Sequence, residues 1–169
     1  MRIIAITGHT GGLGLALFNY FKDRGDEVIG MSRSNGYELP DRNSAVFDIA
    51  RTADLFVNNA YGGQAQTEFI KLLYNKVPII SMGSMAADYP KDTAYYRNKK
   101  LLEETHVKFK KISPLPMLLL KMGYLENWTD REGVPYQQIV NAVDFWLNNP
   151  RASIIEFDNI RYDNSFRTD

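Results

Sequence analysis

Short apolar runs alternate along this 169-residue chain with stretches in which apolar residues recur every three or four positions. Such runs are typical of strands buried on both faces of a parallel sheet, and the second pattern is typical of helices that cover it. Their alternation predicts a doubly wound α/β domain. The predicted strands, about seven in all, are residues 3–7, 27–32, 45–49, 55–60, 77–82, 116–121 and 153–157. The predicted helices include one that starts at residue 13, one at 67–74, one that contains Tyr95 and Lys99, and one at 136–147.

The connection between the third and fourth apolar runs does not fit this pattern well. Only residues 50–54 separate 45–49 from 55–60, whereas a parallel crossover normally takes a dozen residues or more. The preceding segment, 35–44, is rich in turn residues and has no helical period. We therefore expect shortened crossover helices, with either a very short third strand or strand boundaries displaced by a few residues.

A glycine-rich turn follows the first strand and opens the first helix. Gly8, Gly11, Gly12 and Gly14 permit positive φ angles and let the backbone approach a ligand closely. The helix after them points unpaired N–H groups toward an anion, as binding the pyrophosphate of a dinucleotide requires. A plain tight turn is the alternative, because Leu17 stands where the strict G-x-G-x-x-G fingerprint has its third glycine or alanine.

Composition narrows the classes of function. An apolar content of 44% over 169 residues predicts one folded domain with a sizeable core. Twenty basic and twenty acidic residues cancel, so no charge excess favours a nucleic acid or a membrane surface as partner. The chain has no cysteine, and His9 and His106 are far apart, which predicts no metal site. With no signal-peptide pattern and no apolar run near the ~20 residues of a membrane helix, we expect a cytoplasmic protein.

A tyrosine and a lysine four positions apart suggest acid–base chemistry. Tyr95 and Lys99 share one face of a predicted helix, where the ammonium can stabilise a phenolate and lower the tyrosine pKa from about 10 toward neutral pH. Ser84, which follows the fifth strand, is a candidate for the same site. Tyr96 and Lys100 have the same spacing and define an alternative register.

The end of the second strand favours NADP over NAD. A site selective for NAD carries an acidic residue roughly 20 residues past the glycines, where it binds the hydroxyls of the adenosine ribose. Ser32, Arg33 and Ser34 stand there instead, and a cation with two hydroxyls suits the 2′-phosphate of NADP. The alternative is that Arg33 is a solvated loop residue.

Several motifs, in their order along the chain, resemble those of the short-chain dehydrogenase/reductase family. They are Thr7-Gly8-x-x-x-Gly12-x-Gly14, Asn58-Asn59-Ala60, Thr93-Ala94-Tyr95 with Asn98-Lys99 and Leu102-Glu103, and the turn from Met122 to Asn127. The resemblance covers nearly the whole chain. It implies a single Rossmann-type domain over residues 1–169 that binds NADP, with Ser84, Tyr95 and Lys99 as the catalytic residues.

Together with the residues at the end of the second strand, the resemblance assigns the cofactor site. Besides Tyr95 and Lys99, the expected cofactor-binding residues are Gly8, Thr10, Gly12, Leu13, Gly14, Ser32, Arg33, Ser34, Asp48, Ile49, Asn59, Ala60, Gly123, Leu125 and Asn127. Asp48 and Ile49 match an acidic–apolar pair that lies by the adenine in the family, although a strand that simply ends in a turn is an equal alternative. In the family's mechanism the tyrosine protonates the carbonyl oxygen, the serine hydrogen-bonds to it and the lysine holds the ribose.

The chain departs from the family pattern at several positions. Tyr61 replaces the glycine after Asn-Asn-Ala, Met122 replaces a proline and Asn127 replaces a threonine. Tyr95 follows Ser84 by eleven residues, which is fewer than is usual in the family.

The family's catalytic asparagine has no counterpart in the helix before Ser84. Asn75 is too close to Ser84 in sequence to take its place. Water, Gln64 or Gln66 would have to complete the proton relay.

The expected function is an NADP-dependent oxidoreductase that transfers hydride between the nicotinamide and a small carbonyl or alcohol substrate. A regulator that binds NADP without turnover is the alternative, which the shortened helices and the absent asparagine favour. Members of the family associate through the helices on either side of the serine strand, so we expect a homodimer formed through the helix that contains Lys99. The polar tail, 158–169, is expected to be flexible or to contact the partner.

Overall fold

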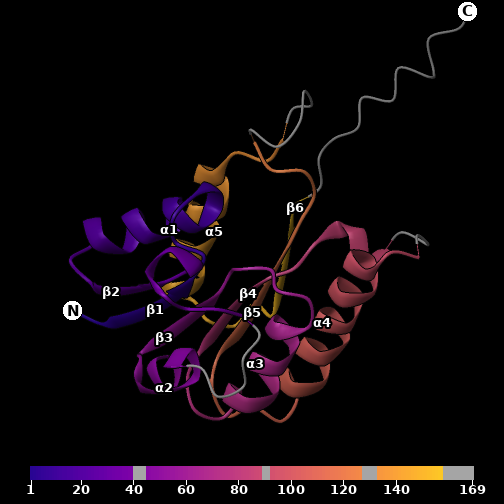
Figure 1. The fold of residues 1–169 in the computed structure, drawn as a ribbon, viewed down its shortest axis with the longest axis horizontal. Coiled ribbons are helices and arrows are strands. Elements are labelled where there is room, and N and C mark those ends of the chain that lie inside the picture. The colour runs from indigo at the N-terminus through magenta and orange to yellow at the C-terminus, as the bar shows by residue number, and fades with distance from the viewer. Residues whose placement is uncertain (40–44, 89–91, 127–132, 158–169) are drawn as a thin grey trace, which may run out of the picture.

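The computed structural model describes residues 1–39, 45–88, 92–126 and 133–157, which form one parallel sheet with helices around it (Figure 1). The strand order is β2-β1-β3-β4-β5-β6. The strands are β1 (Ile3–Thr7), β2 (Glu27–Met31), β3 (Leu55–Asn58), β4 (Ile79–Met82), β5 (Met117–Met122) and β6 (Ile154–Phe157). The predicted doubly wound α/β fold is confirmed, with six strands in the described residues where about seven were expected.

Helices cover both faces of this sheet (Figure 1). One face carries α1 (Gly12–Asp23) and α5 (Tyr136–Asn148), and the other carries α2 (Ala45–Thr52), α3 (Ala65–Leu73) and α4 (Ala94–Lys110). Along β5, Leu118 and Leu120 pack on the α1–α5 side, whereas Leu119 packs on the α4 side. This alternation explains why the strands are apolar throughout. In the described part of the chain, no helix is long and apolar enough to cross a membrane.

Residues 45–49 form a helix, so the strand predicted there is wrong. They are the first part of α2, in which Val46 and Ala50 lie one turn apart and pack in a cluster with Phe69 of α3. Val46, Ala50 and Ala53 continue the apolar pattern at helical spacing, through residues that the strand interpretation assigns to a loop. The connection from β2 to β3 therefore contains a short crossover helix of eight residues, in place of the predicted third strand.

The strand order reverses at β1. Because β2 lies on one side of β1 and β3 on the other, the carboxyl ends of β1 and β3 flank a topological switch point, where open α/β sheets bind ligands. The Thr7 hydroxyl at the end of β1 accepts hydrogen bonds from the backbone N–H groups of Asn59 and Ala60, both at 3.0 Å. The Asn59 side-chain amide donates to the Thr7 carbonyl at 2.9 Å. These bonds hold the two strand ends together.

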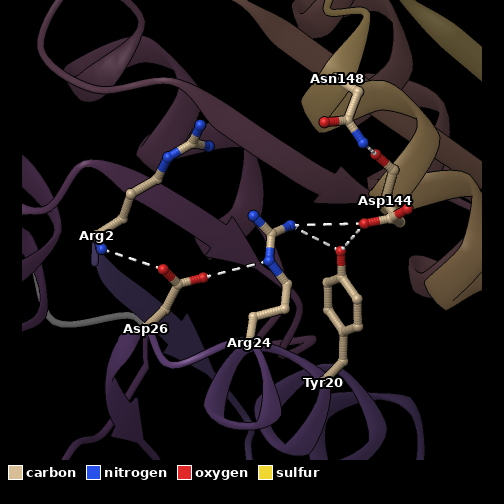
Figure 2. Close-up of polar contacts among 6 residues, drawn as sticks. All are labelled: Arg2, Tyr20, Arg24, Asp26, Asp144 and Asn148. Carbon is tan, nitrogen blue, oxygen red and sulfur yellow. Dashed lines mark hydrogen bonds and ion pairs between the residues drawn. The ribbon is translucent and has the colours of Figure 1, made fainter.

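A polar cluster at the amino-terminal edge of the sheet fastens α1 to α5 (Figure 2). The Tyr20 hydroxyl donates to Asp144 Oδ1 at 2.5 Å and accepts from Arg24 at 2.8 Å. Arg24 also pairs with Asp26 at 3.6 Å, and Asp26 accepts a hydrogen bond from the backbone N–H of Arg2 at 3.1 Å. The cluster orients α1, and with it the glycine turn at the other end of that helix, against the sheet.

Candidate functional site

The glycine turn brings the backbone of α1 against the end of β1. Gly8 has a φ of +71° and donates its N–H to the Met31 carbonyl at 2.7 Å. A Cβ at position 14 would lie 2.0 Å from the Gly8 carbonyl oxygen, so only glycine fits there. Gly12, with a φ of +53°, begins α1, and within the described residues no side chain caps this helix start. Its N–H groups, next to the exposed Thr10, are therefore available to an anion.

Three of the predicted cofactor residues support this turn through their side chains. Leu13 is only 5% exposed and packs in the core between α1 and the sheet. The Asn59 amide donates to the Gly8 carbonyl at 3.3 Å as well as to Thr7. The Cβ of Ala60 lies 3.0 Å from where a Cβ on Gly8 would stand. Because these side chains contact the protein itself, the part of the turn that remains available to bind a ligand is its backbone.

The end of β2 forms a capped 3₁₀ turn, η1 (Arg33–Asn35). Asn35 Oδ1 accepts from the Ser32 backbone N–H at 2.8 Å, and the hydroxyls of Ser32 and Ser34 lie 2.8 Å apart. Arg33 is exposed at the carboxyl end of β2, on the edge where the glycine turn lies. The structure thus places Ser32, Arg33 and Ser34 directly after β2, and their contact with a cofactor stays a prediction.

Asp48 and Ile49 do not end a strand, so the adenine contact predicted from that placement is corrected. Both lie in α2, where the exposed Asp48 pairs with Arg51 at 3.1 Å and Ile49 packs against the cluster around Phe56. The acidic–apolar pair is an ordinary surface and core pair of a helix.

Ser84, Tyr95 and Lys99 come together at the carboxyl ends of β4 and β5. Ser84 follows β4, accepts from the Ala86 N–H at 3.1 Å and shares a side-chain hydrogen bond with Tyr95. Thr93 caps α4 by accepting from the Tyr96 N–H at 3.4 Å, which starts the helix just before Tyr95.

Burial distinguishes the two tyrosine–lysine registers. Lys99 is 5% exposed and donates to the Met82 carbonyl at 2.7 Å. Lys100 is exposed and lines a hollow of about 550 Å³ on the outer side of α4, together with Glu104 and Lys108. Only the register of Tyr95 and Lys99 faces Ser84 and the sheet.

The electrostatics of the pair differ from the expectation. Burial raises the pKa of Tyr95, and the hydrogen bond from Ser84 offsets this only in part. Burial also lowers the pKa of Lys99 to about 8. The predicted lowering of the tyrosine pKa by the ammonium is absent among the described interactions, in which Lys99 Nζ donates to Gln66 and Met82.

Gln66, and not Gln64, contacts Lys99. Gln66 is 2% exposed and accepts a hydrogen bond from Lys99 Nζ at its Oε1, at 2.8 Å. Its Nε2 donates to the carbonyls of Asn58 at 2.9 Å and Met82 at 3.2 Å, so the amide orientation is fixed. Gln64 is exposed at the start of α3. The sequence pointed to either glutamine; the fold selects the one whose side chain enters the core.

Sequence reasoning missed Tyr61 as a site residue. Its ring lies 5.1 Å from the Tyr95 ring, and its hydroxyl accepts from Asn98 Nδ2 at 3.0 Å. Lys99 Nζ lies 5.5 Å from the centre of the Tyr61 ring. The available signal was the replacement of the family's glycine at this position.

A second buried lysine, Lys121, was also missed. Its Nζ contacts Asp88 at 2.7 Å, Glu103 at 3.2 Å and Glu156 at 3.6 Å. Asp88 belongs to the turn η2 (Met85–Asp88) that follows Ser84, Glu103 to α4 and Glu156 to β6. Lys121 therefore fixes the distance between the Ser84 turn and α4. In the sequence, Lys121 is the last residue of a predicted apolar strand, and nothing in the sequence indicates which carboxylates it contacts.

The turn after β5 is partly described. Gly123 donates its N–H to the Phe157 carbonyl at 3.0 Å, and Leu125 pairs with Val134 in an isolated bridge. Asn127, like the loop that follows it and the tail 158–169, lies outside the described residues.

The two histidines have packing roles. The His9 ring lies 5.1 Å from that of Phe18. His106 is fully buried, its Nε2 lies 3.0 Å from the Ser153 carbonyl, and burial lowers its pKa to about 4. Within the described residues there is no group of histidine and acidic side chains that could hold a metal ion.

Comparison with known proteins shows similarity in structure alone. No protein-family model and no curated sequence matches the chain. Solved structures do match: UDP-N-acetylglucosamine 4-epimerase from Bacillus cereus has a TM-score of 0.73 and 18% identity, over 93% of this chain and 78% of that one. The 3-alpha-hydroxysteroid dehydrogenase from Pseudomonas sp. B-0831, complexed with NADH, has a TM-score of 0.69 and 17% identity, over 92% and 95%.

A third structure, described as a small-chain dehydrogenase, has a TM-score of 0.74 and 16% identity, over 93% of this chain and 96% of that one. At such identities the matches establish the fold. The resemblance to short-chain dehydrogenases and reductases is therefore confirmed at the level of the fold.

The buried ammonium of Lys99 predicts a pH dependence of stability. Because its pKa falls from 10.5 to about 8 on folding, the unfolded chain binds more protons than the folded protein between those values. The contribution of Lys99 to stability therefore rises with pH through this window. Urea unfolding from pH 7 to 10 should show the free energy of unfolding of the wild type increasing relative to that of Lys99→Met. A difference between the two proteins that stays constant with pH would show that Lys99 titrates normally.

Proposed function

We propose that the protein is an NADP-dependent oxidoreductase of the short-chain dehydrogenase/reductase type, acting on a small carbonyl or alcohol. The observation that carries this proposal is the position of Ser84, Tyr95 and Lys99 at the same edge of the sheet as the glycine turn. The first lies after β4 and the other two on α4, so that a cofactor bound across the switch point would reach all three.

The residues of the turn fit a dinucleotide. The close approach of Gly14 to Gly8 leaves the turn without side chains that would block a pyrophosphate, and the N–H groups at the start of α1 have no side-chain cap in the described residues. Gly8, Thr10 and Gly12 would hold the pyrophosphate, and Arg33 the adenosine end. Asn59 and Ala60, which pack against Gly8, would line the pyrophosphate site on the β3 side.

The proposed roles of the catalytic residues follow from their hydrogen bonds. The nicotinamide, when bound, supplies or accepts the hydride. The Tyr95 hydroxyl donates a proton to the carbonyl oxygen in reduction and takes it back in oxidation. The Ser84 hydroxyl, already bonded to Tyr95, orients that oxygen. Lys99 favours the phenolate that Tyr95 becomes and holds the ribose, for which its Nζ has to leave Met82.

One observation favours the second candidate, a regulator that binds NADP without turnover. Lys99 Nζ donates to Gln66 and Met82 inside the protein, and burial holds the Tyr95 pKa above its usual value. A tyrosine in this state is a poor proton donor at neutral pH. The enzyme proposal therefore requires that Lys99 turns toward Tyr95 when the cofactor binds.

The proposal is tested first by removing the proton of Tyr95. Tyr95→Phe should preserve NADPH binding and lower turnover at least ~100-fold, because only the general acid has been lost. Lys99→Ala should weaken both binding and turnover. Tyr96→Phe and Lys100→Ala, on neighbouring positions of α4, are the matched controls and should change neither. Binding is measured by NADPH fluorescence and turnover with a panel of small carbonyl compounds.

Two results would contradict the enzyme proposal. If the control variants lose activity and Tyr95→Phe does not, the site lies one residue along the helix. If NADPH binds to every protein and the wild type reduces no carbonyl in a broad panel, the regulator replaces the enzyme.

Arg33 carries the preference for NADP. It is exposed at the end of β2, where a charge-assisted hydrogen bond to a phosphate is typically worth about 1.5–3 kcal/mol. The wild type should bind NADPH roughly 10-fold or more tightly than NADH, and Arg33→Ala should abolish most of the difference. Titration of both cofactors against both proteins measures this. Equal affinities in the wild type would remove the basis for NADP selectivity.

The proposal includes a homodimer formed through the outer face of α4. Val107 on α4 and Ile112 just after its end are 40% and 61% exposed and line the same hollow as Lys100, which leaves apolar surface for a second copy. Light scattering at micromolar concentration should give a particle of twice the 19.3 kDa chain mass. A particle of monomer mass would exclude the dimer.

A further inference from the structure

Tyr61 lies between the glycine turn and Tyr95. It follows Ala60, whose Cβ lies against Gly8, and its hydroxyl reaches Asn98 on α4. The side chain therefore crosses from the carboxyl end of β3 to α4, over the part of the sheet edge that separates the turn from Tyr95. A ligand that runs from the glycine turn to Tyr95 has to pass it.

The Tyr61 ring also covers the ammonium of Lys99. Lys99 Nζ lies 5.5 Å from the centre of the Tyr61 ring and 5.8 Å from that of Tyr95, distances typical of cation–π contacts. On its other side the ammonium donates to Gln66 and Met82. With rings above and acceptors below, Lys99 is 5% exposed and cannot contact a ligand.

Among the described residues, Tyr61 has few contacts for an aromatic side chain. The residue is 46% exposed, and Gly62 and Gly63 follow it. A Cβ at Gly63 would meet no atom within 4 Å, and its φ of +56° suits glycine. Turning the ring away would break the hydrogen bond from Asn98, the contact with Tyr95 and the cation–π contact, and among these three partners only Lys99 is buried. Tyr61 can turn away at small cost.

We propose that Tyr61 is a positioning residue that holds Lys99 inward in the free protein and turns away when the cofactor's ribose takes its place beside the ammonium. The inference rests on the proposed function, because the ligand that displaces Tyr61 is the dinucleotide. Tyr61 thereby acts through Lys99. It lowers the affinity for the cofactor, because the arrangement in which Tyr61 covers Lys99, here called the closed arrangement, has to be broken before the cofactor binds.

The accessibility of Lys99 tests the shielding without any cofactor. Acetic anhydride should acetylate Lys99 roughly threefold or more faster in Tyr61→Ala than in the wild type, relative to Lys100 in the same digest. Tyr61→Phe keeps the ring but loses the hydrogen bond from Asn98, and Asn98→Ala loses the same bond from the other side, so both variants should give the same, smaller increase. Tyr96→Ala, which also removes a ring packed on Tyr95, is the matched control and should have no effect.

Cofactor titration tests the displacement. NADPH should bind roughly three- to tenfold more tightly to Tyr61→Ala than to the wild type, because the closed arrangement no longer competes. Weaker binding would mean that Tyr61 stacks on the cofactor, and an unchanged Lys99 acetylation rate in both Tyr61→Ala and Asn98→Ala would mean that it shields nothing; either result overturns the inference. If no protein, the wild type included, binds NADPH or NADH, the proposed function fails and the displacement with it, while the acetylation rates still report the shielding separately.

Discussion

The start of α1 touches the end of β1 so closely that position 14 has no room for a side chain, and the rest of the site depends on this contact. A Cβ there would lie 2.0 Å from the Gly8 carbonyl oxygen and 2.6 Å from the Asn59 amide. The contact sets the helix start beside the gap between β1 and β3, where the strand order reverses. Thr7 and Asn59 hold that gap from both sides, and the Tyr20–Asp144 bond (Figure 2) fixes the far end of the helix. The result is a turn whose N–H groups have no side-chain cap among the described residues.

A network of buried polar side chains, formed by Asn58, Gln66 and Ser81, lies behind Lys99. Burying these groups costs free energy unless they are hydrogen-bonded to one another. Asn58 Nδ2 donates to the Gln66 carbonyl at 2.9 Å and to Ser81 Oγ at 3.2 Å, while the Gln66 amide returns a bond to Asn58. Buried amides and ammonium groups each lose several hydrogen bonds to water, so the network is stable only when nearly every group is paired. This pairing gives Lys99 a defined inward position. The same pairing explains why the ammonium does not lower the pKa of Tyr95 in the free protein.

The sequence could predict the parts of this structure that depend on local pattern. The apolar runs predicted all six strands, β1 to β6, within about two residues, since a strand buried on both faces has to be apolar throughout. The strand prediction for 45–49 is wrong because five apolar-rich residues fit a strand and a helix equally well. The helix is favoured by the packing of Val46 and Ala50 in one cluster with Phe69, which the sequence does not show. Order along the chain placed Ser84 and Tyr95 near one another. It could not find contacts made only in three dimensions, such as Tyr61 on Lys99.

Lys99 and Lys121 are almost equally buried but have different neighbours. This difference indicates a structural role for Lys121 and leaves Lys99 as the candidate for a functional one. Lys121 is 4% exposed and lies within 3.6 Å of three carboxylates. Burial lowers its pKa, but the hydrogen bonds and charges of Asp88 and Glu103 outweigh that effect and hold the pKa above its usual value. Lys99 is 5% exposed and, in the described part of the chain, has only the neutral oxygens of Gln66 and Met82 as acceptors. A buried ammonium without a counter-ion is unfavourable in the free protein, and a ligand rich in hydroxyls or negative charge relieves that cost. An ammonium already neutralised by carboxylates gains little from such a ligand. The charge left uncompensated at Lys99 therefore supports the proposal that Lys99, and not Lys121, would meet a cofactor.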